Sequence, residues 1–434
     1  MIYYCIGIKG AGMSTLANCL NDLGNEVIGY DDHQEYKFTE EGLIKRNIKI
    51  NYGPSDIPKN AIVTYSKAFS ESHPEIKRMH DLGYNIVDYN MVVGQITEKF
   101  KTIAINGTHG KTTITAMIAH TFSELIKLNY YIGDGTAMVD KNNEFLVIEA
   151  DEYNKHFLAY HPTISITSNI EADHLECYKN GLDEIIDTFE IFNNKAELSI
   201  VNGDDHNIRS MNLKHRYITF GLDEKNDVYA QNFQMNNEGI VFDCFNHGNF
   251  YGHFELPFYG KHMLYNSLAI ISLALELNIK FDILISKLKT FQGAHRRFKV
   301  TKLNDNYLID DYAHHPSEIK ATIAAAKQRF NNQKIISVFM PNTYSRTKDL
   351  FDDFVDALAL SDIAYITPIN SNREKENDYP GITSDKLVSS INNALLLNEN
   401  NFKDLLKHHN SVILFMSCAD ISPLINRYCK EYNE

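Results

Sequence analysis

The chain has 434 residues and 44% of them are hydrophobic, so it is long enough for several domains with sizeable cores. Its formal net charge of −14 argues against sequence-independent nucleic-acid binding, which relies on clustered lysine and arginine. The sequence shows no targeting segment and no apolar run of the roughly 18 residues that a membrane span needs, and its six cysteines form no C-x-x-C pair. We therefore expect a cytoplasmic protein with reduced thiols, no membrane insertion and no nucleic-acid partner.

Strand-like and helix-like patterns alternate along the chain, which predicts an α/β protein with mainly parallel sheets. We expect three domains, at 1–98, 99–293 and 294–434. A β-rich stretch is expected at 229–258, and the polar run 371–380 is expected to be a mobile loop or a plain surface connection. The predicted strands are 2–8, 26–30, 102–105, 144–150, 163–168, 198–201, 307–309, 334–339, 363–367 and 411–415.

The segment 7–14, with the sequence GIKGAGMS, stands between a predicted strand and a predicted helix over 13–23. Gly10 and Gly12 fit the start of the dinucleotide fingerprint, and Thr15 occupies its third glycine position. The pattern is typical of a phosphate or diphosphate resting on a helix N-terminus. A tight turn without a ligand and the nucleotide site of an NAD-dependent oxidoreductase are the alternatives.

The segment 107–113, with the sequence GTHGKTT, follows the apolar run 102–105 and precedes a helical pattern. Strand, glycine turn and helix N-terminus make a phosphate cradle, because backbone amides converge there and the helix dipole adds positive potential. Lys111 adds a cation, and Thr112 offers a hydroxyl to Mg²⁺. Ile105 stands where the longer standard loop has its first glycine, so an ordinary turn remains an alternative. We expect this loop to bind ATP.

Acidic residues follow two strands of the same predicted domain, in the segments 149–152 (EADE) and 169–174 (NIEADH). Because parallel strands end at one edge of a sheet, these groups are expected beside the phosphate loop. Carboxylates and an imidazole at that edge are suited to Mg²⁺ that bridges ATP phosphates. Helix caps and solvated turns are the alternative interpretation of such acids.

Four further motifs lie downstream, and they combine basic, acidic and amide side chains near predicted strand ends. Two adjacent histidines after two aspartates are hard to explain as core residues. Arg346 suits a carboxylate or phosphate, although a surface salt bridge would also explain it. The motifs are GKHMLYN at 260–266, GAHRRF at 293–298, IDDYAHHP at 309–316 and PNTYSR at 341–346.

Together these motifs resemble the ATP-dependent Mur ligases of peptidoglycan synthesis, and the resemblance covers nearly the whole chain. It is strongest to the branch that acts on UDP-N-acetylmuramic acid. The resemblance implies a Rossmann-like N-terminal domain for the UDP-sugar, a central P-loop-type ATPase domain with a parallel sheet, and a Rossmann-like C-terminal domain that brings the amino acid. It also implies that ATP converts the muramyl carboxylate to an acyl phosphate, which the amine of L-alanine then attacks.

The resemblance assigns roles to individual residues. The catalytic residues implied are Lys111, Glu149, His174, His314 and Arg346. The nucleotide-binding residues implied are Gly107, Thr108, His109, Gly110, Lys111, Thr112, Thr113, Asn266, Arg297 and Asp311. The UDP-sugar site implied consists of Gly10, Ala11, Gly12, Met13, Ser14 and Asp31. The Mg²⁺ ligands implied are Thr112, Glu149 and His174.

The chain departs from the family pattern in its last domain. The family usually has His where Asn342 stands, some members have Arg where Thr343 stands, and Gly-Ala-Gly-Asp is usual where the chain has Ser417-Cys-Ala-Asp420. These departures leave open a ligase that joins another amino acid or a peptide to the nucleotide, or a non-catalytic nucleotide-binding paralogue. We expect a monomer or a homodimer.

Overall fold

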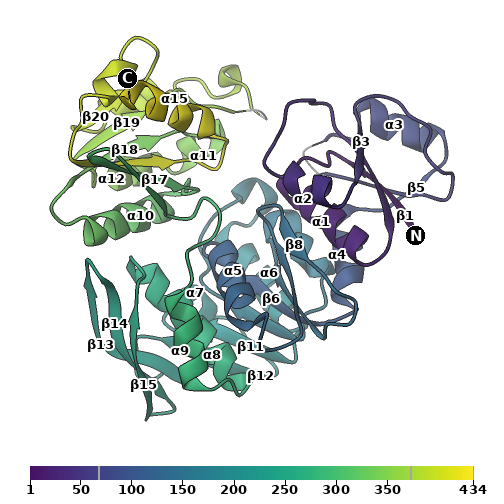
Figure 1. Ribbon diagram of the computed structural model, residues 1–434, viewed down its shortest axis with the longest axis horizontal. Helices are drawn as coiled ribbons and strands as arrows, with labels where there is room; N and C mark the ends of the chain where they lie inside the picture. Colours follow the sequence, from purple (N-terminus) through teal and green to yellow (C-terminus); the bar gives the residue numbers. More distant parts are fainter. Residues whose placement is uncertain (67–68, 372–373, 434) are drawn as a thin grey trace. The chain divides into compact units, whose positions relative to one another are not determined.

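In this computed structural model, residues 1–66, 69–371 and 374–433 are described (Figure 1). The chain divides into two compact units, which are described one at a time. The first unit comprises Met1–Gln231, Cys244–Gly252 and Tyr265–Phe291, and the second comprises Asn232–Asp243, His253–Leu264 and the chain from Gln292 onward. The described residues form sheets of five, ten and six strands, and most of the strand pairs are parallel, which confirms the predicted α/β class.

The five-stranded sheet belongs to the first unit and has the order β3-β2-β1-β4-β5, with parallel pairs throughout. This is the Rossmann order, in which a ligand site lies where the order reverses, at the carboxyl end of the first strand. The glycine segment follows β1 at that point. The elements are β1 Ile2–Ile6, α1 Ala11–Asp22, β2 Glu26–Tyr30, α2 Glu40–Lys45, β3 Lys49–Asn51, β4 Ile62–Tyr65, α3 Pro74–Asp81, β5 Asn85–Ile86 and α4 Tyr89–Thr97.

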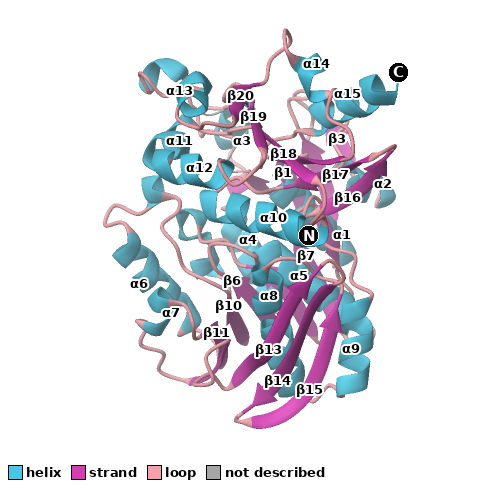
Figure 2. Ribbon diagram, turned by 90° about the vertical axis from the view of Figure 1, so that its left-hand side faces the viewer, coloured by secondary structure: helices cyan, strands magenta, loops and turns pink. Residues whose placement is uncertain are grey.

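The ten-stranded sheet has the order β15-β14-β13-β12-β11-β10-β6-β9-β7-β8, and β6, which precedes the phosphate loop, pairs with β9 and β10. Figure 2 shows β13 to β15 as long strands, and these contribute residues to both units. The elements are β6 Lys101–Asn106, α5 Lys111–Phe122, β7 Leu128–Ile132, β8 Thr136–Met138, β9 Phe145–Glu149, η1 Tyr153–Ala159, β10 Ile164–Thr167, η2 Leu175–Cys177, α6 Leu182–Asn193, β11 Leu198–Asn202, α7 His206–Arg209, β12 Arg216–Gly221, β13 Val228–Asn236, β14 Gly239–Asn246, β15 Asn249–Leu256, α8 Lys261–Glu276 and α9 Phe281–Lys289.

The six-stranded sheet lies in the second unit, with the order β16-β17-β21-β18-β19-β20, and only its pair β16–β17 is antiparallel among the described residues. The elements are β16 Lys299–Leu303, β17 Asn306–Asp311, α10 Pro316–Arg329, β18 Lys334–Phe339, α11 Tyr344–Asp349, α12 Phe351–Leu358, β19 Ile363–Ile366, η3 Glu376–Asp378, α13 Ser384–Ser389, β20 Ala394–Leu396, α14 Phe402–Leu405, β21 Ser411–Met416 and α15 Ser422–Asn433.

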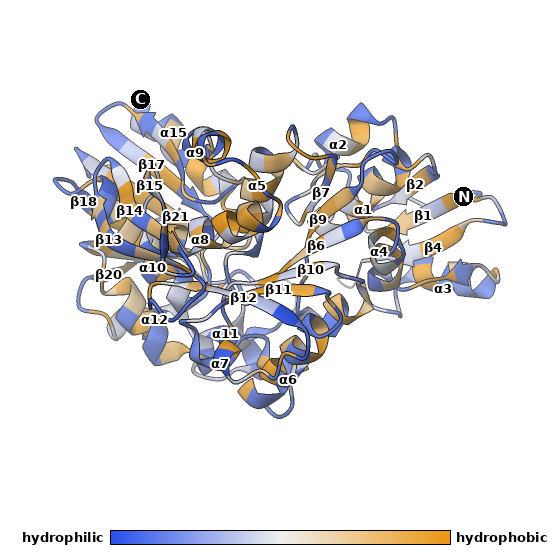
Figure 3. Ribbon diagram, turned by 90° about the horizontal axis from the view of Figure 1, so that it is seen from below, coloured by the Kyte–Doolittle hydropathy of each residue, from blue (hydrophilic) through white to orange (hydrophobic). Residues whose placement is uncertain are grey.

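The sheets are buried on both faces, as β21 illustrates. Val412, Leu414 and Met416 pack in one hydrophobic cluster, whereas the alternate residues Ile413 and Phe415 pack in another. Two covered faces explain why these strands are continuous apolar runs rather than alternating patterns. Figure 3 shows the same hydrophobic character along α5, which packs against β7 and β9.

Most of the predicted strands are confirmed with shifts of one or two residues, and β2 and β18 have the predicted bounds. Part of the polar run 371–380, residues 372–373, lies outside the described residues, and η3 forms within the remainder. All six cysteines are free thiols. Within the described ranges, no helix combines the length and the apolar character that a bilayer crossing requires. The domain bounds 1–98, 99–293 and 294–434 stay a prediction.

Candidate functional site

The loop between β6 and α5 has a backbone that favours glycine at two positions. Gly107 has a φ of 133° and Gly110 a φ of 88°, where residues with a Cβ are strained. A Cβ on Gly107 would also lie 2.2 Å from Ser168 Oγ. Gly110 is the N-cap of α5, and no side-chain cap bond is made at this helix end. A helix that begins at such a glycine turn has the geometry in which backbone amides face an anion, as in a phosphate loop.

Residues at the end of β10 hold this loop in place. Asn169 accepts the Thr108 amide on its carbonyl oxygen and the His109 amide on Oδ1, both at 2.9 Å. Ser168 Oγ donates to the His109 carbonyl at 2.6 Å. The amide of Glu171 donates to Thr108 Oγ1 at 2.8 Å. Two motifs that are separate in sequence, GTHGKTT and NIEADH, thus form one hydrogen-bonded surface.

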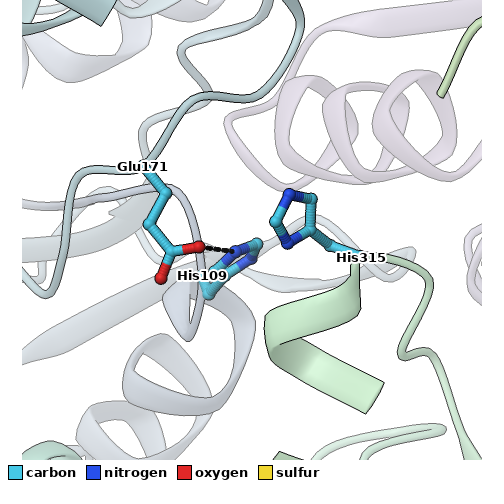
Figure 4. Close-up of side chains that lie close together, drawn as sticks. All are labelled: His109, Glu171 and His315. Carbon is cyan, nitrogen blue, oxygen red and sulfur yellow. Dashed lines mark ion pairs between the residues drawn. The ribbon is translucent and has the colours of Figure 1, made fainter. Parts of the chain in front are cut away.

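The side chain of His109 is oriented by the second of these motifs. Its Nε2 lies 3.4 Å from Glu171 Oε2, an ion pair when the imidazole is protonated (Figure 4). The imidazole is largely buried and the Glu171 carboxylate is partly exposed. His315, which Figure 4 also draws, belongs to the second unit and is described with it.

Lys111 is buried and directed back onto its own loop. Its Nζ donates to the Gly107 carbonyl at 2.6 Å and to Glu152 Oε2 at 2.7 Å. Burial lowers the pKa of Lys111, but the nearby carboxylates of Glu152, Asp151 and Glu149 outweigh burial and leave the pKa raised. Lys111 therefore stays cationic, and its charge is paired with the Glu152 carboxylate.

Thr112 and Glu149 bring oxygen ligands together beside the loop. Thr112 Oγ1 donates to Glu149 Oε2 at 3.1 Å, and Glu149 Oε1 accepts the Gly133 amide at 2.8 Å. A hydroxyl and a carboxylate oxygen at this separation are the hard ligands that Mg²⁺ prefers. The donor set therefore fits the metal that the sequence predicts for these two residues.

His174 lies in the loop after β10, with the left-handed φ of 54°. Its amide donates to Asp173 Oδ1 at 2.8 Å, and its ring nitrogens lie 3.8 Å from Asp173 Oδ2 and 3.6 Å from Glu176 Oε1. The edge-on ring of Tyr153 packs against it, with 5.0 Å between centroids. Its role as a metal ligand together with Glu149 stays a prediction.

Asn266, on α8, is buried and lies beside the phosphate loop. Its Oδ1 would be 3.3 Å from a Cβ on Gly110. The fold thus brings this residue to the loop with which the family resemblance associates it, from a distant part of the chain.

The first glycine segment forms the start of α1, with Gly10 as its N-cap and no side-chain cap bond. Asp31 is buried and braces the segment, because its carboxylate accepts the amides of Lys9 at 3.0 Å and His33 at 3.2 Å. Asp32 is more exposed and lies 3.1 Å from the His73 imidazole. Both oxygens of Asp31, predicted to bind the UDP-sugar, thus accept hydrogen bonds within the loop.

The remaining predicted residues of this segment differ in exposure. Met13 and Ser14 are buried, and Ser14 Oγ donates to the Ala11 carbonyl at 2.8 Å. A Cβ on Gly12 would lie 2.9 Å from the hydroxyl of Tyr89, so the helix approaches α4 closely there. The backbone of the segment, more than its side chains, is therefore what could meet a diphosphate.

In the second unit, Glu318 organises the histidine motif. Its carboxylate accepts the amides of His314 at 3.0 Å and His315 at 3.2 Å, and it lies 3.7 Å from the Arg297 guanidinium. His315 is the N-cap of α10, with its Nδ1 accepting the Ser317 amide. His315 thus has a structural role, and His314 presents its ring 3.1 Å from Glu318.

Asp311 is buried at the end of β17. Its carboxylate accepts the amides of Phe298 at 2.7 Å and Ala313 at 2.8 Å and the hydroxyl of Thr322 at 3.2 Å. Burial raises the pKa of Asp311, and the positive charge of Arg297 acts in the opposite direction. Asp311 therefore fixes the backbone on both sides of the basic and histidine motifs.

Arg346 lies on the short helix α11, whose N-terminus is held by Glu374. The Glu374 carboxylate accepts the amides of Tyr344 at 2.6 Å and Ser345 at 3.1 Å, and the hydroxyls of Ser345 at 2.5 Å and Tyr379 at 3.4 Å. The polar run that was expected to be a loop is thus docked on the motif that carries Arg346.

The departure at Ser417 is accommodated inside the second unit. Ser417 is fully buried, its Oγ donates to the Met340 carbonyl at 2.9 Å, and Arg296 donates to the carbonyls of Ser417 at 2.8 Å and Ala419 at 3.0 Å. The serine hydroxyl is therefore part of the packing of this turn.

Sequence reasoning missed three groups that hold the site together: Gly133, Glu318 and Glu374. Glu152 was expected beside the phosphate loop as part of the EADE motif, but its pairing with Lys111 was not expected. Glu318 had a detectable signal, since an acid three residues after a capping residue is the capping-box pattern. Gly133 and Glu374 act on residues distant in sequence, so no local pattern identifies them.

Comparisons with known proteins cover almost the whole chain. Family models match the Mur ligase family catalytic domain over residues 2–101, the Mur ligase middle domain over 105–274 and the Mur ligase glutamate ligase domain over 296–415. The UDP-N-acetylmuramate–L-alanine ligase of Lacticaseibacillus casei is 39% identical over 99% of this chain and 97% of its own. The enzyme of the same name from Pediococcus pentosaceus is 39% identical over 98% of each chain.

Solved structures give the same picture. The UDP-N-acetylmuramate–alanine ligase of Thermotoga maritima has a TM-score of 0.82 and 27% identity, covering 100% of this chain and 99% of its own. A murein peptide ligase from Psychrobacter arcticus has a TM-score of 0.73 and 20% identity with the same coverage, which shows a shared fold.

We expect Gly107→Ala to weaken the binding of a fluorescent ATP analogue by about tenfold or more, because the methyl group would collide with Ser168 Oγ and displace the loop. Gly181→Ala is the matched control, since Gly181 also has a positive φ, 67°, but a Cβ there meets no atom within 4 Å. A fluorescence titration of both folded variants measures the difference. Equal affinities would contradict the assignment of this loop to nucleotide binding.

Proposed function

The chain belongs to the Mur ligase family, and we propose that it joins L-alanine to the carboxylate of UDP-N-acetylmuramic acid at the expense of ATP, a step in the synthesis of peptidoglycan precursors. The observation that carries this proposal is the 39% identity to curated ligases of this specificity along 99% of the chain. Identity over that length includes the parts expected to bind the nucleotide-sugar, ATP and the amino acid. The geometry of the phosphate loop supports the same conclusion.

The first chemical step is the activation of the acid. An oxygen of the muramyl carboxylate attacks the γ-phosphorus of ATP, and the bond between that phosphorus and the β,γ-bridging oxygen breaks to release ADP. We assign Lys111 to the β- and γ-phosphates, for which it would exchange Glu152, and the N-terminus of α5 would add donors for the same oxygens. Positioning and neutralisation of charge are the main contributions of a protein to such a transfer.

The second step forms the amide. The neutral amine of L-alanine attacks the carbonyl of the acyl phosphate, and the tetrahedral intermediate expels phosphate, which takes up the proton that the nitrogen loses. The second unit carries Arg346 and His314, which we assign to the amino-acid side. Arg346 suits the α-carboxylate, because a guanidinium binds a carboxylate through two parallel hydrogen bonds. Glu374 supports this role by fixing the first turn of the helix that carries Arg346.

Magnesium is the metal that the oxygen donors favour. Thr112 and Glu149 would hold it, and His174 is the third group we assign to it. The ion supplies neutralisation of charge on the transferred phosphoryl group. The residues themselves contribute in two ways. Glu149 accepts the hydrogen bond of the Thr112 hydroxyl, and Lys111 stays protonated although it is buried.

Two further expectations belong to the proposal. The substrates are intracellular metabolites, so we place the protein in the cytoplasm. We expect a monomer or a homodimer.

We expect phosphate release by the purified protein to require UDP-N-acetylmuramic acid, an amino acid, ATP and Mg²⁺ together, because the acyl phosphate forms from ATP and the muramyl carboxylate and expels its phosphate only when an amine attacks it. A coupled phosphate assay with a panel of amino acids and with murein tripeptide measures the requirement. The highest kcat/KM is expected with L-alanine. Preference for the tripeptide would identify a peptide ligase, and phosphate release that is unchanged by omitting the acceptor would contradict ligation.

Lys111→Ala is expected to lower turnover far more than tenfold, since the variant loses the buried cation beside the phosphates. A loss of less than about tenfold, or ~1.4 kcal/mol of transition-state stabilisation, would rule out this role. Lys101→Ala is the control, because its ion pair with Glu144 is exposed and lies at the start of β6. Thermal melting of both variants checks that the fold is intact.

Asn342→His restores the residue usual in the family, and Asn342 directly precedes the segment that carries Arg346. If this position contributes to amino-acid selection, kcat/KM for L-alanine is expected to rise by about twofold to tenfold, equivalent to up to ~1.4 kcal/mol. The same panel of amino acids measures it. An unchanged kcat/KM for every amino acid would mean that Asn342 has no part in selection.

A further inference from the structure

The third position of the glycine fingerprint holds a residue that the proposed function does not explain. A dinucleotide-binding helix keeps this position small so that helix and strand pack closely. Here Thr15 is fully buried on α1, and its Oγ1 lies 2.9 Å from the Ala11 carbonyl and 3.1 Å from the carbonyl of Ile132. Ile132 is the last residue of β7, in the ten-stranded sheet. The hydroxyl therefore links the helix of the first glycine segment to the neighbouring sheet.

The hydrogen bond of Thr15 holds the turn between β7 and β8, which consists of Gly133, Asp134 and Gly135. Asn18 of α1 donates to the Gly135 carbonyl at 3.4 Å, and the Tyr131 hydroxyl donates to the Gly12 carbonyl at 3.1 Å. Together with Thr15, these bonds attach both ends of the turn to α1. All of these residues lie within the first unit.

The other side of the same turn contacts the phosphate loop through Glu149. The Gly133 amide donates to Glu149 Oε1 at 2.8 Å, while Glu149 Oε2 accepts the hydroxyl of Thr112 at 3.1 Å. A Cβ on Gly133 would lie 3.0 Å from Oε2 and 3.3 Å from the carboxylate carbon. The carboxylate is thus held between the turn and α5, and glycine is the residue that leaves it room.

Rotation of a terminal carboxylate is soft, since its last torsion has a broad, roughly two-fold distribution. A single backbone amide on one oxygen therefore fixes the plane of the Glu149 carboxylate, and with it the direction in which the other oxygen faces Thr112. Groups that orient a metal ligand from outside the coordination shell commonly change metal affinity when they are lost.

We propose that the β7–β8 turn positions the carboxylate of Glu149, which we assign to the metal. The amide of Gly133 orients this carboxylate toward Thr112. Thr15 holds the turn in place through its hydrogen bond from α1. The inference rests on the proposed function, because it takes Glu149 and Thr112 as the metal ligands. It adds Gly133 and Thr15 to the machinery, and it explains why the fingerprint has threonine at its third position.

Gly133→Ala tests the first half of the proposal. Gly133 does not have a positive φ, so alanine fits the backbone and only the carboxylate is displaced. The affinity for Mn²⁺ in the presence of a non-hydrolysable ATP analogue is expected to fall by about tenfold. It is measured by electron paramagnetic resonance, as the decrease in the signal of unbound Mn²⁺. The KM for UDP-N-acetylmuramic acid is expected to change by less than about twofold, since α1 is untouched.

Thr15→Val tests the second half, because valine keeps the shape of the side chain and removes the hydroxyl. Mn²⁺ affinity is expected to fall in the same direction by about threefold, and Thr15→Ser is expected to restore it, because serine returns the hydroxyl. Gly53→Ala is the control for both variants, since a Cβ there meets no atom within 4 Å and its φ is not positive. Thermal melting accompanies each measurement.

The outcomes separate the inference from the function on which it rests. Unchanged Mn²⁺ affinity in folded Gly133→Ala would overturn the positioning role, and a lower melting temperature with unchanged affinity in Thr15→Val would overturn the anchoring role. Wild-type protein that binds the Mn²⁺–nucleotide pair but releases no phosphate in the complete assay would overturn the proposed ligase instead. Weaker Mn²⁺ binding in both variants, with rescue by Thr15→Ser, supports the inference.

Discussion

The close approach of two loops at the carboxyl edge of the ten-stranded sheet is the constraint on which the site depends. β6 and β10 pair in parallel with Asn106 opposite Thr167, so the loops that follow them start at the same level and press against one another. The backbone at Gly107 lies so close to Ser168 that a side chain cannot enter. Because this contact fixes where α5 begins, it also fixes where Lys111 and Thr112 point. The directions of these two side chains, which we assign to the phosphates and to Mg²⁺, thus depend on that one packing contact.

Acidic side chains of the protein pair with the groups that we assign to the substrate anions. Glu152 accepts the hydrogen bond of Lys111, and Glu374 covers the first amides of α11. A chain with a net charge of −14 can keep its buried cations paired in this way. The exchange of a carboxylate for a phosphate replaces one charge-assisted hydrogen bond by another, so affinity reflects the difference between the two. The pairing of Lys111 with Glu152 leaves neither of these two buried charges without a partner.

Much of the fold and part of the site could be predicted from the sequence, for identifiable reasons. Strands such as β2 and β18 were predicted with their bounds, because short apolar runs between turn residues are a strong local signal. The phosphate loop was predicted because its backbone requires glycine at particular positions, and glycines at this spacing are visible in a short segment of sequence. Asp31 and Asp311 are different: each was expected at a ligand, and each accepts backbone amides of its own loop. His315, in a motif that was expected to form a site, likewise accepts an amide of its own helix. The sequence does not distinguish a carboxylate or imidazole that accepts backbone hydrogen bonds from one that binds a ligand.

The sequence by itself determined the α/β class, the two glycine loops and the family to which the chain belongs, because these depend on residue type and on spacing within short segments. Only the tertiary structure decided which acid holds Lys111, that Gly133 orients Glu149, and that Thr15 connects α1 to the turn after β7. These contacts join residues from 16 to 117 positions apart. Hydrogen bonds of this kind are set by strand order and packing, which no local pattern of residues records.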